Sequence, residues 1–341
     1  VTFASSVLPR SGTSGAMVKS KKKVVLITGC SSGIGLSLAV MLAKDEKKRY
    51  RVIATMRDLN RKDKLVEAAG DAYGKTLSLA VLDVCNDESV KQCVNDIKGR
   101  HVDILINNAG IGIVGPVESI TIEEMQAVFE TNVFGVIRMI KEVMPDMKKR
   151  RAGHIIVISS VLGVQSLSAL VCLVFAGVGF HDVYAASKFA IEGFCESLAV
   201  QLMMFNIKLS LIEPGPVRTD FEIKMIQEVK ERECPGADPE TVHYFKNLYL
   251  PSAINIFLAV GQTPKEISKV SFQAVYFSAS LFIYLFRNLT NSLYAPIVAL
   301  KYADESGDLS VNFFYHMLFN LGRQESTFSL RPRVNLSEKL N

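Results

Sequence analysis

The chain has 341 residues, of which 49% are hydrophobic, and its formal net charge at pH 7 is +5. A chain of this length can bury a large core, and it fits one large α/β domain with tails. The charge excess is small and basic residues alternate with acidic ones, which excludes the basic footprint of a nucleic-acid-binding protein. The six cysteines include no C-x-x-C pair and the five histidines form no ligand pattern. We therefore expect free thiols, a reducing compartment and no metal site.

The two ends of the chain differ from its middle. Residues 1–16 are rich in Ser, Gly and Thr, and Met17 precedes a short lysine cluster. We interpret residues 1–16 as a leader or disordered tail. Residues 17–265 are expected to form a single domain. Residues 266–341 are expected to form a helical and apolar extension that completes a substrate pocket or contacts a membrane.

A strand predicted at Val24 to Ile27 leads into a glycine-rich loop and then into a helix from Leu36 to Lys44. This order is typical of dinucleotide sites, because glycines let the backbone approach a pyrophosphate that sits on the helix N-terminus. A tight structural turn is the alternative. The residues expected to hold the phosphates are Thr28, Gly29, Ser31, Ser32, Gly33, Ile34 and Gly35.

Arg57 follows a second strand, predicted from Tyr50 to Thr55. In a dinucleotide fold this position meets the adenosine ribose, where an acid binds the 2′-hydroxyl of NAD and a cation suits the 2′-phosphate of NADP. Arg57 therefore favours NADP(H) as the cofactor. The neighbouring Asp58 argues in the other direction, and the alternative for Arg57 is a loop residue turned to solvent.

Strands predicted at Leu77 to Leu82 and Asp103 to Ile106, with a helix from Glu88 to Lys98 between them, continue the alternation of strand and helix. Such alternation predicts an α/β fold with a doubly wound parallel sheet of the Rossmann type. Ligands of these sheets bind at the carboxyl ends of the strands. We therefore expect cofactor contacts from Asp83, at the adenine, and from Asn108, Ala109 and Gly110.

Tyr184 and Lys188 are four residues apart, so on a helix they share one face. An ammonium beside a phenol favours the phenolate, which lets a group with an unperturbed pKa of about 10 exchange a proton nearer neutral pH. Taken alone, the pair also fits an ordinary helix face. Ser160 ends a strand predicted from His154, and we expect its hydroxyl to orient a substrate oxygen.

Two further features complete the predicted site. Asn132 lies in the middle of a helix predicted from Ile122 to Lys149, where Asn is a poor helix former, and we expect it to hold a proton-relay water. A sixth strand, from Leu209 to Ile212, leads into a proline-glycine turn that is well placed to hold a carboxamide. The residues of this turn are Pro214, Gly215, Val217 and Thr219.

In this order, these motifs resemble the short-chain dehydrogenase/reductase family: Thr28 to Gly35, Asn107 to Gly110, Asn132, Ser160, Tyr184-x-x-x-Lys188 and Pro214-Gly215. The resemblance spans Lys22 to Asp220. It implies an NADP(H)-dependent oxidoreductase in which Tyr184 passes the proton and Ser160 steadies the substrate oxygen. Lys188 would tune the tyrosine, and both Tyr184 and Lys188 would contact the cofactor.

Four stretches resemble the branch of this family that acts on retinoids and steroids: Cys30 to Leu36, Ala54 to Asp58, Asp182 to Ala190 and Glu213 to Val217. A fifth stretch, Pro235 to Pro251, resembles the retinoid enzymes of this branch most. This resemblance implies the interconversion of all-trans-retinal and all-trans-retinol. A 17β-hydroxysteroid dehydrogenase with the same catalytic residues is the alternative. The resemblance also implies a small apolar substrate, a homodimer and peripheral contact with the cytoplasmic face of membranes, including the photoreceptor outer segment.

The segment before Tyr184 departs from the family pattern. Ser160 and Tyr184 are farther apart than in similar enzymes, and we interpret the apolar residues 166–176 as an insertion. No charged residue occurs from Ile155 to Phe180, so hydropathy alone predicts a transmembrane helix there. We favour a strand followed by the insertion, because the family pattern needs Ser160 beside Tyr184. A second alternative function follows, a form that binds the cofactor without turnover because the insertion separates these two residues.

The C-terminal part departs from the pattern as well. Residues Val270 to Phe286 carry no charge, and we expect a core helix and a last strand at Leu281 to Phe286, with a membrane span as the alternative. No cysteine follows Cys234, so we expect no acyl anchor on the tail. The apolar run Phe313 to Phe319 is the remaining candidate for membrane contact, and a packed helix is its alternative.

Overall fold

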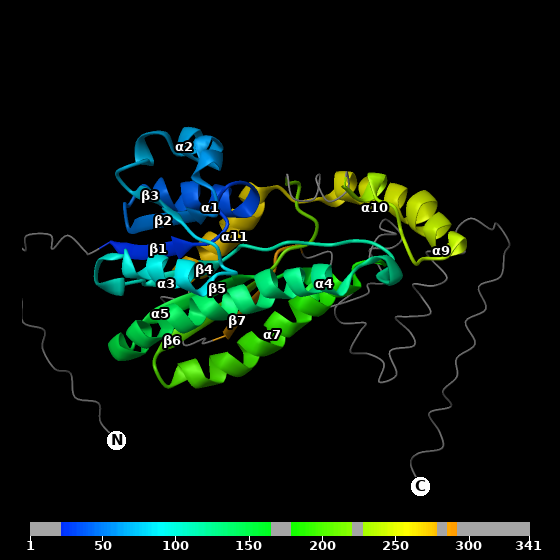
Figure 1. The fold of residues 1–341 in the computed structure, drawn as a ribbon. Coiled ribbons are helices and arrows are strands. Elements are labelled where there is room, and N and C mark those ends of the chain that lie inside the picture. Colours follow the sequence, from blue (N-terminus) through cyan, green and yellow to red (C-terminus); the bar gives the residue numbers. More distant parts are fainter. Residues whose placement is uncertain (1–21, 165–178, 220–227, 278–284, 292–341) are drawn as a thin grey trace, which may run out of the picture.

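The computed structural model describes residues 22–164, 179–219, 228–277 and 285–291. At its centre is a parallel sheet of seven strands in the order β3-β2-β1-β4-β5-β6-β7 (Figure 1). The order reverses between β1 and β4, as in a doubly wound sheet, so the predicted fold class is confirmed. The strands are β1 (Lys23–Ile27), β2 (Tyr50–Met56), β3 (Leu77–Val81), β4 (Ile104–Asn107), β5 (Gly153–Ile158), β6 (Ile207–Glu213) and β7 (Leu285–Leu289).

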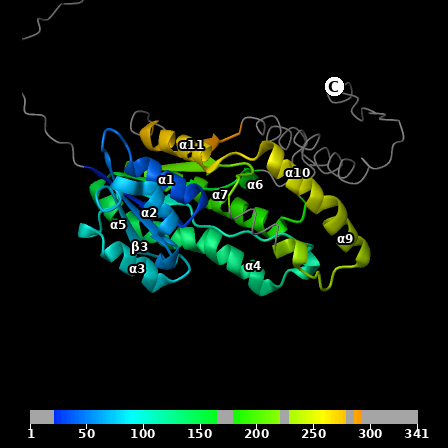
Figure 2. The ribbon, with the colours of Figure 1, turned by 90° about the horizontal axis from the view of Figure 1, so that it is seen from above.

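Helices cover both faces of the sheet. On one face lie α1 (Gly33–Ala43), α2 (Asp63–Ala69) and α11 (Pro264–Phe277), and on the other lie α3 (Asp87–Asn95), α5 (Val136–Arg150) and α7 (Asp182–Met203) (Figures 1 and 2). The remaining helices are α4 (Ile122–Phe129), the π-helix η5 (Glu130–Gly135), α6 (Val161–Val164), α9 (Pro239–His243), the π-helix η7 (Tyr244–Tyr249) and α10 (Leu250–Val260), with short 3-10 turns η1 (Leu59–Arg61), η2 (Gly70–Ala72), η3 (Lys98–Arg100) and η4 (Val117–Ser119).

The core consists of two hydrophobic layers, one on each face of the sheet. Ile155 and Val157 of β5 belong to the layer under α5 and α7, whereas Ile156 and Ile158 belong to the layer under α1 and α11. Side chains of a strand alternate between the faces, so a strand that is buried on both sides reads as an unbroken apolar run. This explains why β5 resembles a membrane segment in its sequence.

Helices α9, η7 and α10 form an arm beyond the carboxyl ends of the strands, at the end of the molecule opposite α2 and α3 (Figures 1 and 2). Asp238 begins the arm as a helix cap, accepting hydrogen bonds from the backbone N–H groups of Glu240 and Thr241 at 2.9 and 3.0 Å. Phe245 and Tyr249 pack on Phe180 with ring centroids 4.8 and 5.1 Å apart. This α9–α10 arm is therefore seated over the start of α7.

Most predicted elements are found with small shifts at their ends. The helix predicted from Ile122 to Lys149 is α4, η5 and α5 in direct succession, and the last strand lies at Leu285–Leu289, slightly later than predicted. Within the ranges given above, no helix combines the length and apolarity that crossing a membrane requires. The tail 1–16, the insertion 166–176 and the run 313–319 lie outside the described residues. The domain division at residue 265 stays a prediction, although α11 and β7 pack on the same sheet.

His154 gives the folded state a dependence on pH. Its ring is 5% exposed, Nε2 lies 2.8 Å from Ser210 Oγ, and burial lowers its pKa to about 3. Below pH 6.5 the unfolded chain binds a proton at this position that the folded chain does not, so stability is lost as pH falls. We expect the protonation of His154 in the unfolded chain to lower the free energy of unfolding by about 2 kcal/mol between pH 7 and pH 5, as measured by urea unfolding. The free energy of unfolding of a His154→Gln variant should depend less steeply on pH. A slope equal to that of the wild type would contradict the role of His154 in this pH dependence.

Candidate active site

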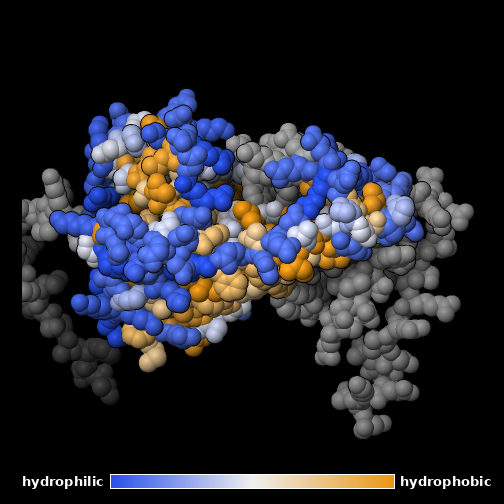
Figure 3. All heavy atoms as spheres, in the orientation of Figure 1, coloured by the Kyte–Doolittle hydropathy of each residue, from blue (hydrophilic) through white to orange (hydrophobic). Residues whose placement is uncertain are grey.

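A cleft of about 600 Å³ opens at the carboxyl ends of the strands. Its lining comes from the loops after β1, β2, β3, β4, β5 and β6, from the start of α7 and from the α9–α10 arm. In the space-filling view, apolar side chains gather along the hollow between the sheet and this arm (Figure 3). The cleft thus lies at the switch point of the sheet, where doubly wound folds bind their ligands.

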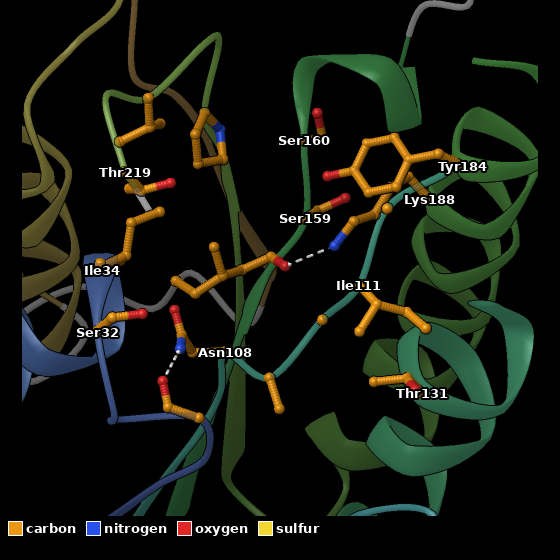
Figure 4. A pocket seen from close by; sticks show the side chains of 18 of the residues that line it. Ser32, Ile34, Asn108, Ile111, Thr131, Ser159, Ser160, Tyr184, Lys188 and Thr219 are labelled. Carbon is orange, nitrogen blue, oxygen red and sulfur yellow. Dashed lines mark hydrogen bonds between the residues drawn. The ribbon is translucent and has the colours of Figure 1, made fainter. Parts of the chain in front are cut away.

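At one end of the cleft, the loop after β1 is tied to the loop after β4. Thr28 Oγ1 accepts hydrogen bonds from the backbone N–H groups of Asn108 and Ala109, each at 2.9 Å. The Asn108 side-chain amide donates to the carbonyl oxygens of Thr28 and Gly29 at 2.9 and 3.0 Å (Figure 4). Thr28 and Gly35, two of the residues predicted to hold phosphates, do not themselves line the cleft.

Glycines allow this loop to pack as closely as it does. Gly29 has φ +71°, and a Cβ there would lie 2.8 Å from Ala109 Cα. A Cβ on Gly35 would lie 2.3 Å from the Gly29 carbonyl oxygen. Ser32, the first residue before α1, makes no capping hydrogen bond with its side chain, so the N-terminus of α1 faces the cleft with its amides uncapped. The loop therefore has the form of a cradle for an anionic phosphate.

Two arginines line the cleft beyond this cradle. Arg57, predicted from sequence, and Arg61 are both exposed residues of the cleft wall. Asp58, whose position next to Arg57 favours NAD over NADP, accepts a hydrogen bond from the Asn60 N–H at 2.9 Å and caps η1. Sequence reasoning missed Arg61, although its spacing of four residues from Arg57 was a usable signal.

The other predicted cofactor contacts gather in the same cleft. Asp83 is on the wall, and its Oδ1 accepts a hydrogen bond from the Cys85 N–H at 3.0 Å. The turn after β6 is held against the end of the arm by Gln262, whose N–H donates to the Pro216 carbonyl oxygen at 2.8 Å. The remaining predicted residues of the lining are Asn108, Ala109, Gly110, Pro214, Gly215, Val217 and Thr219.

Tyr184 and Lys188 of α7 face the cleft together with Ser160 (Figure 4). Lys188 is 7% exposed, its Nζ donates to the Ile158 carbonyl oxygen at 3.2 Å, and the same Nζ lies 5.5 Å from the centroid of the Tyr184 ring. Burial lowers the pKa of Lys188 to about 8, while the carboxylate of Glu192 acts to raise it. The pair can therefore move a proton at the phenol oxygen next to a positive charge.

Two serines, Ser159 and Ser160, directly follow β5 and line the cleft. Ser160 Oγ accepts a hydrogen bond from the Leu162 N–H at 3.1 Å, which leaves its own hydrogen available to a ligand. Ser159 Oγ, which sequence reasoning missed, is buried and has no hydrogen-bond partner among the described residues. A buried hydroxyl without a partner marks a place where a ligand or water is expected.

Asn132 is placed differently from the predicted catalytic serine and tyrosine. It lies in η5, is 2% exposed and does not line the cleft. Its Oδ1 accepts from the Ile111 N–H at 2.9 Å, and its Nδ2 donates to the Ile111 carbonyl oxygen at 2.9 Å and to Ser187 Oγ at 3.0 Å. The amide thus fixes the loop after β4 against α7, and its predicted hold on a relay water stays a prediction.

The far end of the cleft is mainly apolar. Sequence reasoning also missed a polar pair there, in which Tyr249 Oη lies 2.9 Å from His181 Nδ1. Burial lowers the pKa of His181. The apolar residues of this wall are Val114, Val161, Leu162, Val229, Leu250, Ala253 and Phe257.

The cleft as a whole therefore fits a dinucleotide. Side chains at Gly29 and Gly35 would collide with Ala109 and with the Gly29 carbonyl oxygen, and Ser159 supplies a buried hydroxyl without a partner among the described residues, next to Ser160. The Ser160, Tyr184 and Lys188 side chains lie where the cradle end and the apolar end of the cleft meet (Figure 4). This arrangement suits hydride exchange with an apolar carbonyl compound.

Comparisons with known proteins agree with this geometry. A family model described as short chain dehydrogenase matches residues 23–230. The chain belongs to the short-chain dehydrogenase family. Its members are oxidoreductases that use NAD(H) or NADP(H). The short-chain dehydrogenase from Streptomyces avermitilis has the same fold, with a TM-score of 0.64 and 25% identity, over 85% of this chain and 96% of that one.

The chain is also similar to two enzymes that are named as a retinol dehydrogenase and a hydroxysteroid dehydrogenase. It is 54% identical to retinol dehydrogenase 8 of Homo sapiens over 301 residues, which cover 88% of this chain and 92% of that protein. It is 38% identical to 17-beta-hydroxysteroid dehydrogenase type 1 of Homo sapiens, over 87% of this chain and 86% of that protein. The chain therefore lies near the retinoid and steroid enzymes within the family.

Proposed function

We propose that this protein is an NADP(H)-dependent oxidoreductase that interconverts all-trans-retinal and all-trans-retinol. The observation that carries the proposal is the Tyr184–Lys188 pair at the junction of a dinucleotide cradle and an apolar cleft. The 54% identity with a retinol dehydrogenase supports the choice of substrate. A polyene aldehyde is apolar along its whole length except at the carbonyl, which matches a mainly apolar wall next to the donors Ser160 and Tyr184.

The residues of the chain have separate tasks in this reaction. A nicotinamide dinucleotide bound in the cradle supplies the hydride in reduction and accepts it in oxidation. During reduction Ser160 donates a hydrogen bond to the carbonyl oxygen, and Tyr184 gives its phenolic proton to the same oxygen as negative charge develops there. The Lys188 ammonium, 5.5 Å from the phenol ring centroid, stabilises the phenolate that remains. Oxidation of the alcohol follows the same steps in reverse.

The preference for NADP(H) is supported by charge at the adenosine end of the cleft. Arg57 and Arg61 both line this end, and the Asp58 carboxylate is engaged as the cap of η1. Guanidinium groups pair with phosphate through two parallel hydrogen bonds, so two of them suit a 2′-phosphate.

Removing both arginines should change the choice of cofactor. We expect the Arg57→Ala, Arg61→Ala double variant to raise KM for NADPH about tenfold or more, because the 2′-phosphate loses its charged hydrogen bonds. KM for NADH should stay the same. Arg51→Ala is a matched control, since Arg51 is an exposed residue of β2, the strand that precedes Arg57, and does not line the cleft. Equal effects on the two cofactors would contradict the proposed preference.

A steroid 17-ketone is the second candidate substrate, favoured by the 38% identity with a 17-beta-hydroxysteroid dehydrogenase. NADPH oxidation by the purified protein, with all-trans-retinal and estrone offered separately, distinguishes the two. We expect turnover of retinal at the higher kcat/KM. Faster turnover of estrone would contradict the proposed substrate. NADPH binding without turnover of either compound would instead identify a cofactor-binding form.

We further propose a peripheral location on the cytoplasmic face of membranes, including the photoreceptor outer segment, and a homodimer. The membrane location has a physical reason, because an apolar polyene partitions into lipid and has to enter the cleft from there. Leu248 of the α9–α10 arm is 43% exposed, and an exposed large apolar side chain suits contact with a lipid surface. The homodimer is proposed from the family resemblance alone.

A further inference from the structure

A buried carboxylate lies directly behind the proposed catalytic pair. Glu192 is one helical turn beyond Lys188 on α7, and Lys188 is one turn beyond Tyr184. Residues four apart share a helix face, so the three side chains form a row that leads from the cleft into the interior. Glu192 is 4% exposed and Lys188 is 7% exposed. Both charged groups of this row are therefore inside the protein.

Helix α6 packs closely against the Glu192 end of this row. A Cβ on Gly163 of α6 would lie 2.8 Å from Ser159 Oγ, 2.9 Å from Glu192 Cγ and 3.0 Å from the Lys188 carbonyl oxygen. The backbone of α6 is thus in contact with Ser159 and with the stem of Glu192. Because a helix backbone closes the site at this point, the charges of Lys188 and Glu192 interact in a medium of low polarity.

Lys188 needs a counter-charge in this setting. Burial alone disfavours its ammonium form, and its Nζ donates a hydrogen bond to a neutral group, the Ile158 carbonyl oxygen, at 3.2 Å. The carboxylate of Glu192 acts in the opposite direction and raises the pKa of Lys188. Cys195 lies on the other side of this carboxylate, and burial, followed by the Glu192 and Glu196 charges, raises the pKa of its thiol.

Other titratable groups near α7 are placed less favourably for this task. His154 of β5 and Lys208 of β6 lie near the amino ends of their strands, away from the cleft. His181, at the start of α7, has its pKa lowered by burial. Glu213, at the carboxyl end of β6, is 4% exposed and follows Ile212, whose carbonyl accepts from the Ser159 N–H. It is the one competitor that a test has to include.

We infer that Glu192 is a positioning residue that keeps Lys188 charged, and so lets Lys188 stabilise the phenolate of Tyr184 during turnover. The inference rests on the proposed function, because it assigns Lys188 a charge-dependent task in that reaction. Glu192 itself touches neither cofactor nor substrate in this account. Its effect passes through Lys188 alone.

The titration of Lys188 can be followed without substrate or cofactor, by NMR of protein labelled with ¹⁵N-lysine. The Nζ signal of Lys188 is the one absent from a Lys188→Met variant. We expect its midpoint near pH 8 in the wild type and about one pH unit lower in Glu192→Gln. In reduction assays the same variant should lose roughly fivefold in kcat/KM at pH 8 and almost nothing at pH 6.

Two control variants separate this task from general effects on the helix. Glu196→Gln removes an exposed carboxylate one turn farther along α7, and Glu213→Gln removes the buried one on β6. Both should leave the midpoint of Lys188 unchanged. A midpoint unchanged in Glu192→Gln, or lowered equally by either control, would overturn the inference.

A conservative variant covers the case in which Glu192→Gln does not fold. Glu192→Asp keeps the charge but withdraws it by one methylene, so we expect a smaller shift of the midpoint in the same direction. A wild-type midpoint in Glu192→Asp would then overturn the inference. Since the titration needs no turnover, a wrong substrate assignment would show only in the assays and would leave the NMR result standing.

Discussion

Replacement of Tyr184 by Phe should lower kcat for retinal reduction by about a thousandfold, because the reaction loses its proton donor. The aromatic ring remains, so its edge contact with His181, with centroids 6.4 Å apart, should persist and the fold should be unchanged. NADPH affinity, measured by fluorescence titration, should change little. The loss would therefore appear in kcat rather than in binding.

Ser160→Ala serves as the graded control for this result. It removes one hydrogen-bond donor but leaves the proton source in place, and we expect a smaller loss of about a hundredfold. If Tyr184→Phe kept more activity than Ser160→Ala, the phenol would not be the acid, and the proposed division of tasks would be wrong.

The charge of Lys188 should set the alkaline limit of retinal reduction. Burial lowers its pKa from 10.5 to about 8, so Lys188 is charged below this pH and neutral above it. Since only the charged form stabilises the phenolate, kcat/KM should be constant at neutral pH and fall as pH rises through about 8. A pH profile measured with saturating NADPH tests this expectation.

Two substitutions at the same position sharpen the test. Lys188→Arg carries a guanidinium that stays charged throughout this pH range, so its lower activity should show no fall near pH 8. Lys188→Met should be about a thousandfold less active at every pH. A fall near pH 8 that survives in Lys188→Arg would assign the limit to another group.

The features that the sequence predicted well are local ones. The strands buried on both faces read as apolar runs, and the glycines that permit the close contacts at Gly29 and Gly35 leave a recognisable pattern between β1 and α1. Tyr184 and Lys188 are related by the period of a single helix, so their shared face follows from spacing alone. These regularities were enough to predict the parallel sheet, the glycine-rich loop and the shared face of Tyr184 and Lys188.

The features that were missed depend on contacts between distant segments. Glu192 looks like a surface residue of α7 until α6 is packed on it at Gly163. Likewise, the partner of His181 is Tyr249 of the arm, far away in the sequence. Asn132 was singled out as a poor helix former, but its bonding to Ile111 requires the loop after β4 to be in place. Burial and partner choice are tertiary properties, which periodicity does not carry.

The most direct test of the proposed function follows the hydride itself. NADPH with deuterium in place of both hydrogens at nicotinamide C4 is incubated with the protein and all-trans-retinal, and the product is analysed by mass spectrometry. We expect retinol that carries one deuterium at the former carbonyl carbon, and almost none of it with Tyr184→Phe. Unchanged retinal, or retinol without deuterium, would contradict the assignment of this cleft as a retinal reductase.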